Sequence, residues 1–445
     1  MSEAAMHRAA RLDFGFPTWR AALPVPRMGG READGAAVAA GGFAGRCFLF
    51  LQGPASPFGI RLARALSRRG ARIVKVHLCG GDVVFWPGRA RLYRGRPEQW
   101  PAHVERLMAE EAVTDLVLFG DCRPYHVPAV GAARARGLRL HLLEEGYVRP
   151  GWITCEPHGV NDHSDLPRSP GAVLAAAAGV AAPQEGAPFA EPFARRALWD
   201  IAWQVGQAAL VPLFPRYRRH TLVHPVVDYA GWVVRWLTGA GAARRDRAAR
   251  ASLGGGAPCF LLPLQLEGDY QMRVHSRFRS VEEVVRLVLA SFARAAPEEA
   301  RLVVKRHPYD TSLPATRRMV ARVADELGIR ARLVFIEGGD IEALVARSAG
   351  VVLVNSTTAL SALRQGRPLK VLGRATYDMP GLAHQGTLDA FWREAAPPDP
   401  ALVRAYRRLV LARTQVAGGF FAPASIDRAV EGLLARMATR EVLAA

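Results

Sequence analysis

The chain has 445 residues, of which 50% are hydrophobic and 22% charged; this is globular composition, too long for one compact core, and we expect two domains. The 59 Lys and Arg residues outnumber the 40 Asp and Glu residues, and the net charge of +19 predicts an anionic partner: nucleic acid, a phospholipid surface or a phosphorylated substrate. Nucleic acid is the weaker of these, because the sequence has no zinc knuckle, aromatic RNA-binding signature or basic heptad region.

Cysteine usage and hydropathy indicate a cytoplasmic protein. The 5 cysteines are scattered without a Cys-x-x-Cys pair, which favours reduced thiols over a disulfide framework or a zinc site. Residues 1–44 lack the apolar core of a signal peptide, and we expect a flexible leader there. The longest apolar run, residues 172–183, is shorter than the roughly 20 residues of a membrane span. We therefore expect a protein that is soluble or attached peripherally to a membrane.

Residues 45–165 predict a first domain in which buried strands alternate with amphipathic helices. Such alternation is typical of a doubly wound parallel sheet, and here it predicts an N-terminal Rossmann-like domain. The expected strands are 47–52, 72–77, 115–119 and 138–143, and the expected helices are 58–69, 102–112 and 128–136.

Residues 166–253 differ in composition from the first domain and predict a helical insertion or linker. Four tryptophans lie among several arginines: Trp199, Trp203, Trp232 and Trp236. Trp and Arg interleaved on helices suit a membrane interface. Ordinary inter-domain helices with core tryptophans explain the pattern equally well, and the sequence does not decide between the two.

Residues 254–425 predict a second Rossmann-like domain, the nucleotide-sugar domain, followed by a C-terminal helix at 426–445. The expected strands are 259–265, 301–305, 333–336, 350–354 and 368–372, and the expected helices are 281–295, 313–327, 341–346 and 359–365. The predicted fold class is α/β, with two Rossmann-like domains facing a cleft, which is the GT-B type of glycosyltransferase. Neither half contains a Walker A motif, which weakens other nucleotide-binding interpretations.

Glu144 and Glu145 end a predicted strand of the first domain. In α/β proteins ligands bind beyond the carboxyl ends of strands. Two carboxylates that lie close together raise the pKa of one of them, which suits general-base work on an acceptor hydroxyl. The Glu-Glu-Gly sequence is common, so this signal is weak when it stands alone.

Two further strand ends, in the second domain, carry polar side chains. Lys305-Arg306-His307-Pro308 predicts an anion site, where His307 could donate a hydrogen bond or a proton to a leaving phosphate. Asn355-Ser356-Thr357 lies where a strand meets a helix, and hydroxyls and backbone N–H groups there bind phosphate without a metal. The plainer alternatives are a solvated basic turn, a histidine that bonds only the local backbone, and a simple Ser/Thr helix cap. The combination of three polar strand ends favours function.

An acidic pair with Gly, then His-Pro, then a Ser/Thr pair resembles the motif set of bacterial sialyltransferases, which use CMP-activated sugars. Over about residues 46–425 the chain more closely resembles the capsule polysaccharide biosynthesis and export family, the β-Kdo transferases of Gram-negative capsule assembly. The stretches that carry this resemblance, besides those above, include Leu51-Gln52-Gly53-Pro54, Gly120-Asp121-Cys122-Arg123-Pro124, Gly146-Tyr147-Val148-Arg149-Pro150, Pro263-Leu264-Gln265 and Tyr377-Asp378-Met379-Pro380.

The resemblance implies a set of roles. The donor would be CMP-Kdo, and the acceptor a lyso-phosphatidylglycerol-type lipid or a Kdo already attached to one. Glu144 or Glu145 would be the acceptor-side carboxylate, with Asp121 and Glu156 as spare carboxylates; whether the acidic residue is base, ion-pair stabiliser or nucleophile stays open. Nucleotide contacts would come from Lys305, Arg306, His307, Pro308, Glu337, Asn355, Ser356 and Thr357, and acceptor-side or other contacts from Gln52, Asp121, Arg123 and Gln265.

We expect no cofactor beyond the CMP-Kdo donor, and no metal, because no Asp-x-Asp follows a strand. Expected partners are the anionic phospholipid acceptor, the inner face of the inner membrane and a capsule assembly or export complex, but no nucleic acid. Two alternatives remain: a non-catalytic component of capsule export, and a transferase that uses another nucleotide sugar.

Overall fold

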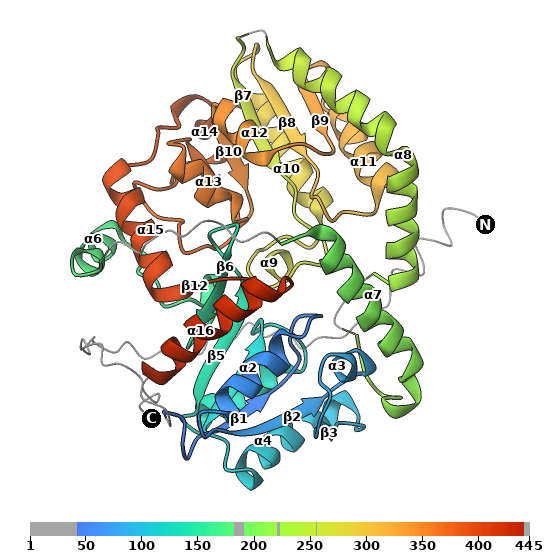
Figure 1. The fold of residues 1–445 in the computed structure, drawn as a ribbon. Helices are drawn as coiled ribbons and strands as arrows, with labels where there is room; N and C mark the ends of the chain where they lie inside the picture. The colour runs from blue at the N-terminus through green and yellow to red at the C-terminus, as the bar shows by residue number, and fades with distance from the viewer. Residues whose placement is uncertain (1–41, 182–190, 220–222, 255, 440–445) are drawn as a thin grey trace. The chain divides into compact units, whose positions relative to one another are not determined.

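The computed structural model describes residues 42–181, 191–219, 223–254 and 256–439 (Figure 1). Nearly all of the predicted leader, residues 1–44, lies outside these ranges. Residues from Ala40 onward belong to one compact unit, which contains two β-sheets.

The first sheet has seven strands in the order β12-β6-β5-β4-β1-β2-β3. Apart from the short exposed strand β3, its parallel part forms from short, mostly buried apolar runs, which is typical of sheets covered by helices on both faces. These strands are β1 (Cys47–Phe50), β2 (Arg72–His77), β3 (Arg91–Leu92), β4 (Asp115–Phe119) and β5 (Arg139–Glu145). The helices between them are α2 (Phe58–Ser67), α3 (Gly80–Val84), α4 (Trp100–Glu110) and α5 (His126–Ala135), with a 3-10 turn η1 (Pro97–Gln99).

A buried carboxylate anchors this sheet at the start of β4. Asp115 accepts hydrogen bonds from Arg46 Nε at 3.0 Å and Thr114 Oγ1 at 2.7 Å, and it bonds His141 Nε2 at 2.8 Å. Burial opposes ionisation of this carboxyl, but the hydrogen bonds from His141 and Arg46 outweigh burial and hold the pKa of Asp115 below its usual range. The charge is therefore part of the core.

The second sheet has five strands in the order β11-β10-β7-β8-β9, all parallel. The strands are β7 (Cys259–Pro263), β8 (Arg301–Lys305), β9 (Leu333–Ile336), β10 (Gly350–Leu353) and β11 (Leu369–Val371). The helices are α9 (Tyr270–Arg273), α10 (Val281–Ala295), α11 (Leu313–Glu326), α12 (Ile341–Arg347) and α13 (Thr358–Arg364), with a 3-10 turn η5 (Arg330–Arg332). Ser280 caps α10 by accepting a hydrogen bond from Glu283 N at 3.2 Å. Lys305 pairs with Pro263 on one side and with Ile336 on the other, so three strands end level with one another.

The two parallel sheets with their helices confirm the predicted α/β class. The sequence missed the antiparallel edge of the first sheet, which is formed by β6 (Trp152–Glu156) and β12 (Gln415–Ala417). Both strands are short, and β12 becomes a strand only because it pairs with a partner 261 positions away, as Gln415 and Thr154 do.

The chain returns to the first sheet at its C-terminal end. After α14 (Leu388–Glu394) and α15 (Pro400–Thr414), β12 joins β6, and α16 (Pro423–Thr439) packs against α2. Phe420 meets Phe58 edge to face, with ring centroids 4.8 Å apart. The prediction of one continuous second domain over 254–425 did not include this return, and the predicted boundaries themselves stay predictions.

The middle of the chain is helical, as predicted. It contains α6 (Pro170–Ala178), α7 (Phe193–Ala209) and α8 (Pro225–Ala251), with 3-10 turns η2 (Asn161–His163), η3 (Val211–Leu213) and η4 (Ser252–Gly254). The two long helices, green in Figure 1, are linked by Tyr229 Oη, which donates to Asp200 Oδ2 at 2.8 Å. Within the ranges that the structure describes, no helix combines the length and hydropathy needed to cross a bilayer.

Candidate active site

The two adjacent glutamates lie inside β5 and not beyond its end. Glu144 pairs with Thr154 and Glu145 with Ile153 of the antiparallel strand β6. Successive side chains of a strand point to opposite faces, so the two carboxylates are separated by the sheet. Glu145 forms an ion pair with Arg196 at 2.9 Å, whereas Glu144 accepts a hydrogen bond from Asn161 Nδ2 at 2.6 Å. The structure therefore places the two carboxylates apart, and the neighbouring charge that most raises the pKa of Glu144 is that of Asp121.

Glu144 nevertheless has a strongly shifted pKa. Loss of solvation raises the pKa of this carboxyl to about 8, and the negative charge of Asp121 adds to the effect. Glu144 thus keeps its proton in most molecules at neutral pH. A carboxyl with a pKa near the working pH can give up or take a proton during a reaction.

Asp121 is the charged partner of Glu144. It follows β4 after Gly120, whose φ of +72° makes the turn. Its carboxylate accepts hydrogen bonds from His163 Nδ1 at 2.9 Å and from Cys122 Sγ at 3.1 Å. Burial opposes its ionisation, but the contacts with His163 outweigh this and hold the pKa of Asp121 below its usual range. Two carboxyls whose pKa values are pushed apart are a pattern of acid–base sites.

His307 follows β8, as the sequence predicted, and it is partly buried. Its Nδ1 accepts a hydrogen bond from Tyr309 N at 3.1 Å, so the proton of the neutral ring is on Nε2. Loss of solvation and the positive charge of Arg149 lower the pKa of His307 to about 4. At neutral pH this histidine is suited to donate a hydrogen bond from Nε2 rather than to act as an imidazolium acid.

Arg149 connects the two halves of the predicted site. Its positive charge lowers the pKa of Glu144 as well as that of His307, so it lies near both residues. It is exposed, and its Nε donates to Gly146 O at 2.9 Å. Arg149 belongs to the motif Gly146-Tyr147-Val148-Arg149-Pro150 but was not predicted as a site residue. The sequence could have indicated this role, because Arg149 is a basic residue that follows the acidic pair within the same motif.

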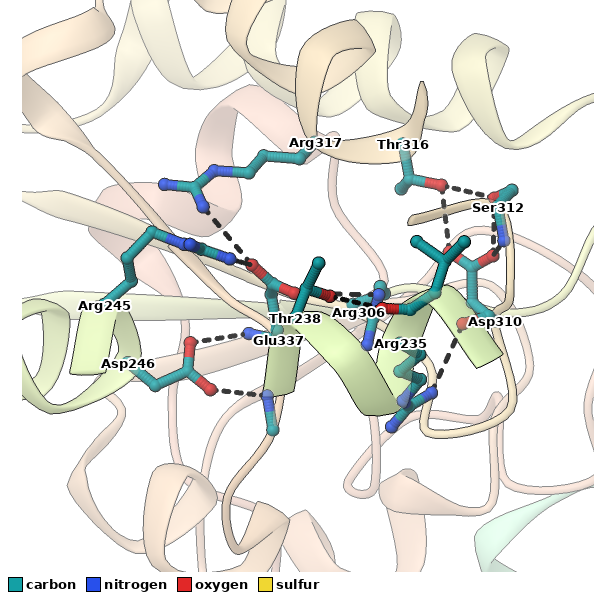
Figure 2. Close-up of polar contacts among 12 residues, drawn as sticks. Arg235, Thr238, Arg245, Asp246, Arg306, Asp310, Ser312, Thr316, Arg317 and Glu337 are labelled. Carbon is teal, nitrogen blue, oxygen red and sulfur yellow. Dashed lines mark hydrogen bonds and ion pairs between the residues drawn. The ribbon is translucent and has the colours of Figure 1, made fainter. Parts of the chain in front are cut away.

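Lys305 and Arg306 are both buried and do not lie on an open turn, and Arg306 belongs to a cluster of charges (Figure 2). The Glu337 carboxylate is surrounded by three arginines: Oε1 lies 2.9 Å from Arg245 and 3.3 Å from Arg317, and Oε2 lies 3.7 Å from Arg306. In this part of the structure Arg306 Nε and Nη1 lack hydrogen-bond partners. A nucleotide contact by Glu337 would require these arginines to release it, so that role stays a prediction.

The loop that carries Glu337 is held by α8. Asp246 accepts hydrogen bonds from Glu337 N at 2.9 Å and Gly338 N at 2.7 Å. Arg235 of the same helix donates to Asp310 O at 3.3 Å. Pro308, two residues before Asp310, is exposed. The helical middle of the chain therefore fixes the polar ends of β8 and β9.

Asn355 forms a paired amide contact with Gln265. Gln265 Nε2 donates to Asn355 Oδ1 at 3.0 Å, and Asn355 N donates to Gln265 Oε1 at 3.1 Å. Ser356 Oγ accepts from Thr358 N at 3.2 Å, and Thr357, the cap residue of α13, makes no side-chain cap hydrogen bond. These four residues thus lie together at the ends of β7 and β10. The contacts explain the loop's conformation, and phosphate binding stays a prediction.

Gln52 and Arg123 belong to one buried network in the first sheet. Arg123 Nη1 donates to Gln52 Oε1 at 3.2 Å, and Gln52 Nε2 donates to Asp82 Oδ1 and Tyr217 Oη, both at 3.3 Å. Glu156 is also buried and accepts from Tyr147 Oη at 2.6 Å. Among the carboxylates named from the sequence, Asp121 and Glu144 are the pair that the structure brings together.

Comparisons with known proteins agree on one family. The model of the family described as capsule polysaccharide biosynthesis protein matches residues 114–421. The chain is similar to the capsule polysaccharide export protein KpsS of Escherichia coli, with 34% identity over 384 residues that cover 84% of this chain and 96% of that protein. It is 32% identical to the capsule polysaccharide modification protein LipB of Neisseria meningitidis serogroup A over 84% of this chain and 91% of that protein.

Among solved structures, the chain is similar to Thermosulfurimonas dismutans KpsC, a β-Kdo 2,7 transferase. The alignment covers 88% of this chain and 100% of that chain at 14% identity, with a TM-score of 0.43. The family match extends from β4 to the residues after β12, and so includes the whole second sheet and strands β4, β5, β6 and β12 of the first.

Proposed function

We propose that this chain, which belongs to the capsule polysaccharide biosynthesis family, is a glycosyltransferase that moves Kdo from CMP-Kdo to a lyso-phosphatidylglycerol-type lipid or a Kdo-lipid. One observation carries the proposal of catalysis. Asp121 and Glu144 come from adjacent strands, and their environments push their pKa values in opposite directions. A protein that only binds a glycan needs no such pair.

The proposed roles follow from the protonation states. The bond between the anomeric carbon and the phosphate oxygen breaks, and its electron pair leaves with CMP. His307 Nε2 and Arg149 stabilise the charge that grows on that phosphate. The ionised Asp121 stabilises positive charge at the anomeric carbon, either as an ion pair or by bonding to it. Glu144, in its ionised form, accepts the proton of the acceptor hydroxyl as the new glycosidic bond forms.

The proposed reaction needs no metal, since one monophosphate is the leaving group and the cations at hand are side chains. Lys305 and Arg306 contribute positive charge, Arg306 from within the cluster around Glu337. Two unit charges about 4 Å apart interact by about 4 kcal/mol at an effective dielectric of about 20, so such cations could lower the barrier substantially.

A surface on α7 and α8 supports a peripheral position on the membrane, where a lipid acceptor would be found. Of 19 large hydrophobic residues that are exposed in the described part of the chain, 13 lie between Phe193 and Leu237. We call these 13 the α7–α8 apolar surface: Phe193, Leu198, Ile201, Val205, Val211, Leu213, Val223, Val226, Val227, Val233, Val234, Trp236 and Leu237.

The charges on these helices complement anionic lipid. Residues 193–251 contain ten arginines and three aspartates, a net charge of +7. The aspartates face the protein: Asp200 bonds Tyr229, Asp228 bonds Thr311, and Asp246 holds the loop after β9. An apolar helix face bordered by arginine binds the interface of an anionic membrane, with about 1 kcal/mol from each basic residue near the surface.

The test is product analysis with the purified full-length chain. CMP-Kdo and a lyso-phosphatidylglycerol acceptor should yield free CMP and a lipid heavier by one Kdo residue in mass spectrometry, in the presence of a chelator. A panel of CMP- and UDP-sugars separates the donors, and a preference for a UDP-sugar would refute the CMP-Kdo assignment. Release of no nucleotide from any donor, with glycolipid binding retained, would favour the non-catalytic export component.

A further inference from the structure

We infer that Asp121, Cys122, His163 and His275 form a binding site for a thiophilic divalent cation such as Zn²⁺. One ligand atom from each residue lies within 4.8 Å of the others. A carboxylate oxygen, a thiolate sulfur and two imidazole nitrogens are the donor set that proteins use for tetrahedral zinc. The sequence did not predict this site, because His163 lies 42 positions from Asp121 and His275 lies 153 positions from Cys122.

The separations between the ligand atoms fit one metal ion. Zinc bonds of about 2.0–2.3 Å in a tetrahedron place neighbouring ligand atoms about 3.3–3.8 Å apart. Here Cys122 Sγ lies 3.6 Å from His275 Nε2, within this range. The two oxygens of Asp121 lie closer to their neighbours, Oδ1 at 3.1 Å from Cys122 Sγ and Oδ2 at 2.9 Å from His163 Nδ1, so these ligand atoms must move a few tenths of an ångström apart. The longest separation, 4.8 Å, requires a contraction of about 1 Å, which rotation of the partly exposed His163 can supply.

The segments that carry these ligands are held by other parts of the fold. The carbonyl of His275 accepts hydrogen bonds from Asn355 Nδ2 at 3.1 Å and Arg374 N at 2.9 Å. The carbonyl of Gly120, next to Asp121, bonds His126 Nδ1 at 2.7 Å. Such outer contacts orient metal ligands and raise affinity. The site is therefore largely formed before an ion arrives.

Charge balance favours binding at this partly buried position. On binding, Cys122 Sγ loses its proton to solvent, and the thiolate and the Asp121 carboxylate together neutralise the two positive charges of the ion. The neutral imidazoles complete the set. A metal bound in this way occupies the carboxylate that the proposed transfer reaction needs to be free. This step rests on the proposed function. The bound metal inhibits the transfer reaction and is not a catalytic centre.

The binding half is tested with metal ions alone, independently of any activity. The full-length chain, reduced and stripped with a chelator, should bind one equivalent of Zn²⁺. Co²⁺ should give a thiolate-to-metal charge-transfer band, and X-ray absorption of the zinc form should show one Zn–S distance of about 2.3 Å. Cys122→Ala should remove the band and weaken Zn²⁺ binding at least about tenfold. Cys259→Ala, at a thiol outside the cluster, is the matched control and should change neither.

His163→Ala serves as a second variant, since the side chain of His163 is 44% exposed; circular dichroism checks that the variant is folded. It too should weaken Zn²⁺ binding at least about tenfold. Equal affinity in the parent, Cys122→Ala and His163→Ala chains would overturn the site, as would the absence of the charge-transfer band. The inhibitory half predicts that one equivalent of Zn²⁺ stops CMP release and that a chelator restores it. Full activity of the zinc-loaded chain would overturn the inhibitory half and leave the binding result unaffected. Absence of transfer under all conditions would count against the proposed function alone.

Discussion

The negative charge of Asp121 helps to keep a proton on Glu144, although the two residues come from different strands and are 23 positions apart in the chain. Each is set by its surroundings: His163 stabilises the ionised form of Asp121, whereas the loss of solvation favours the neutral form of Glu144. The two carboxyls can therefore take different roles at one pH.

Asp121→Asn should lower the rate of CMP release by about 100-fold or more, because the charge that faces the anomeric carbon is lost. The same change should lower the pKa of Glu144, since the like charge that raises it has gone. Rates report the first effect, and ¹³C NMR of labelled glutamate reports the second. Asp165→Asn, at an exposed carboxylate, is the control. An unchanged rate would contradict the role of Asp121.

The rate of transfer should rise with pH through about 8, because Glu144 acts as a base only after it has lost its proton. Glu144→Gln should remove this limb of the pH profile and most of the activity. Glu145→Gln, at the neighbour that pairs with Arg196 on the opposite face of the sheet, should keep it. Persistence of the limb in Glu144→Gln would assign it to another group.

The same carboxyl should make the folded state less stable as pH rises. The pKa of Glu144 is about 8 in the folded chain, whereas a solvated glutamate of the unfolded chain has a pKa near 4.5. Between these pH values the folded chain therefore holds a proton that the unfolded chain has lost. The free energy of unfolding therefore falls across this window. Glu144→Gln should flatten that part of the stability curve in urea titrations at pH 5 to 8.

His307→Ala should reduce CMP release by about 100-fold while the circular dichroism spectrum stays unchanged, because the variant loses the Nε2 donor to the phosphate. His307→Gln keeps an N–H donor and should lose less. Since the pKa of His307 is about 4, no gain in rate is expected between pH 7 and 6 from protonating it. Full activity of the alanine variant would end the case for this residue.

Glu337→Gln distinguishes a structural from a nucleotide-binding role. If the carboxylate holds Arg245, Arg317 and Arg306, its loss should destabilise the fold by about 3–5 kcal/mol, because the buried positive charge of Arg306 is left without its counter-charge. Urea unfolding measures this, with Glu326→Gln on the surface as the control. An unchanged unfolding free energy together with a raised KM for CMP-Kdo would show instead that Glu337 faces the nucleotide.

The α7–α8 apolar surface should bind vesicles that contain phosphatidylglycerol. Val226→Ser combined with Trp236→Ser should reduce co-sedimentation at least about tenfold, since these side chains are 68% and 79% exposed and belong to no core. Leu92→Ser with Leu174→Ser, at exposed positions outside this surface, is the matched control. Undiminished vesicle binding by the first variant would place the membrane contact elsewhere. A change from dimer to monomer in light scattering would identify the surface as a contact between two copies.

Apart from β3, the parallel strands of both sheets could be predicted within a few residues, because parallel strands buried on both faces are short, continuous apolar runs. The polar residues after β4 and β8 could be found for the same reason: a buried run that turns polar marks a strand end. The position of Glu144 could not, since antiparallel pairing with β6 extends β5 through both glutamates. A run of polar residues cannot show that a partner strand lies beside it.

The sequence also could not predict which residues from distant segments contact the site residues. His163 and His275 meet Asp121 and Cys122 from distant segments, and Asp246 reaches the loop after β9 from a long helix. Local patterns report which face of a helix or strand is buried, but not which loops the fold brings together. Lys305 and Arg306 show the same limit, because their sequence suits a solvated turn as well as the buried positions that they occupy.

The pairing of β12 with β6 has a consequence for synthesis on the ribosome. A nascent chain that has emerged as far as β11 contains every parallel strand of both sheets, yet it lacks the strand that covers β6 and the helix that packs against α2. Ile153 and Phe58, both buried in the finished protein, then have no cover from Val416 and Phe420. The first sheet must wait for residues 415–439 before it can close, which makes synthesis of β12 and α16, and not emergence of the first domain, the step that lets this half of the chain fold.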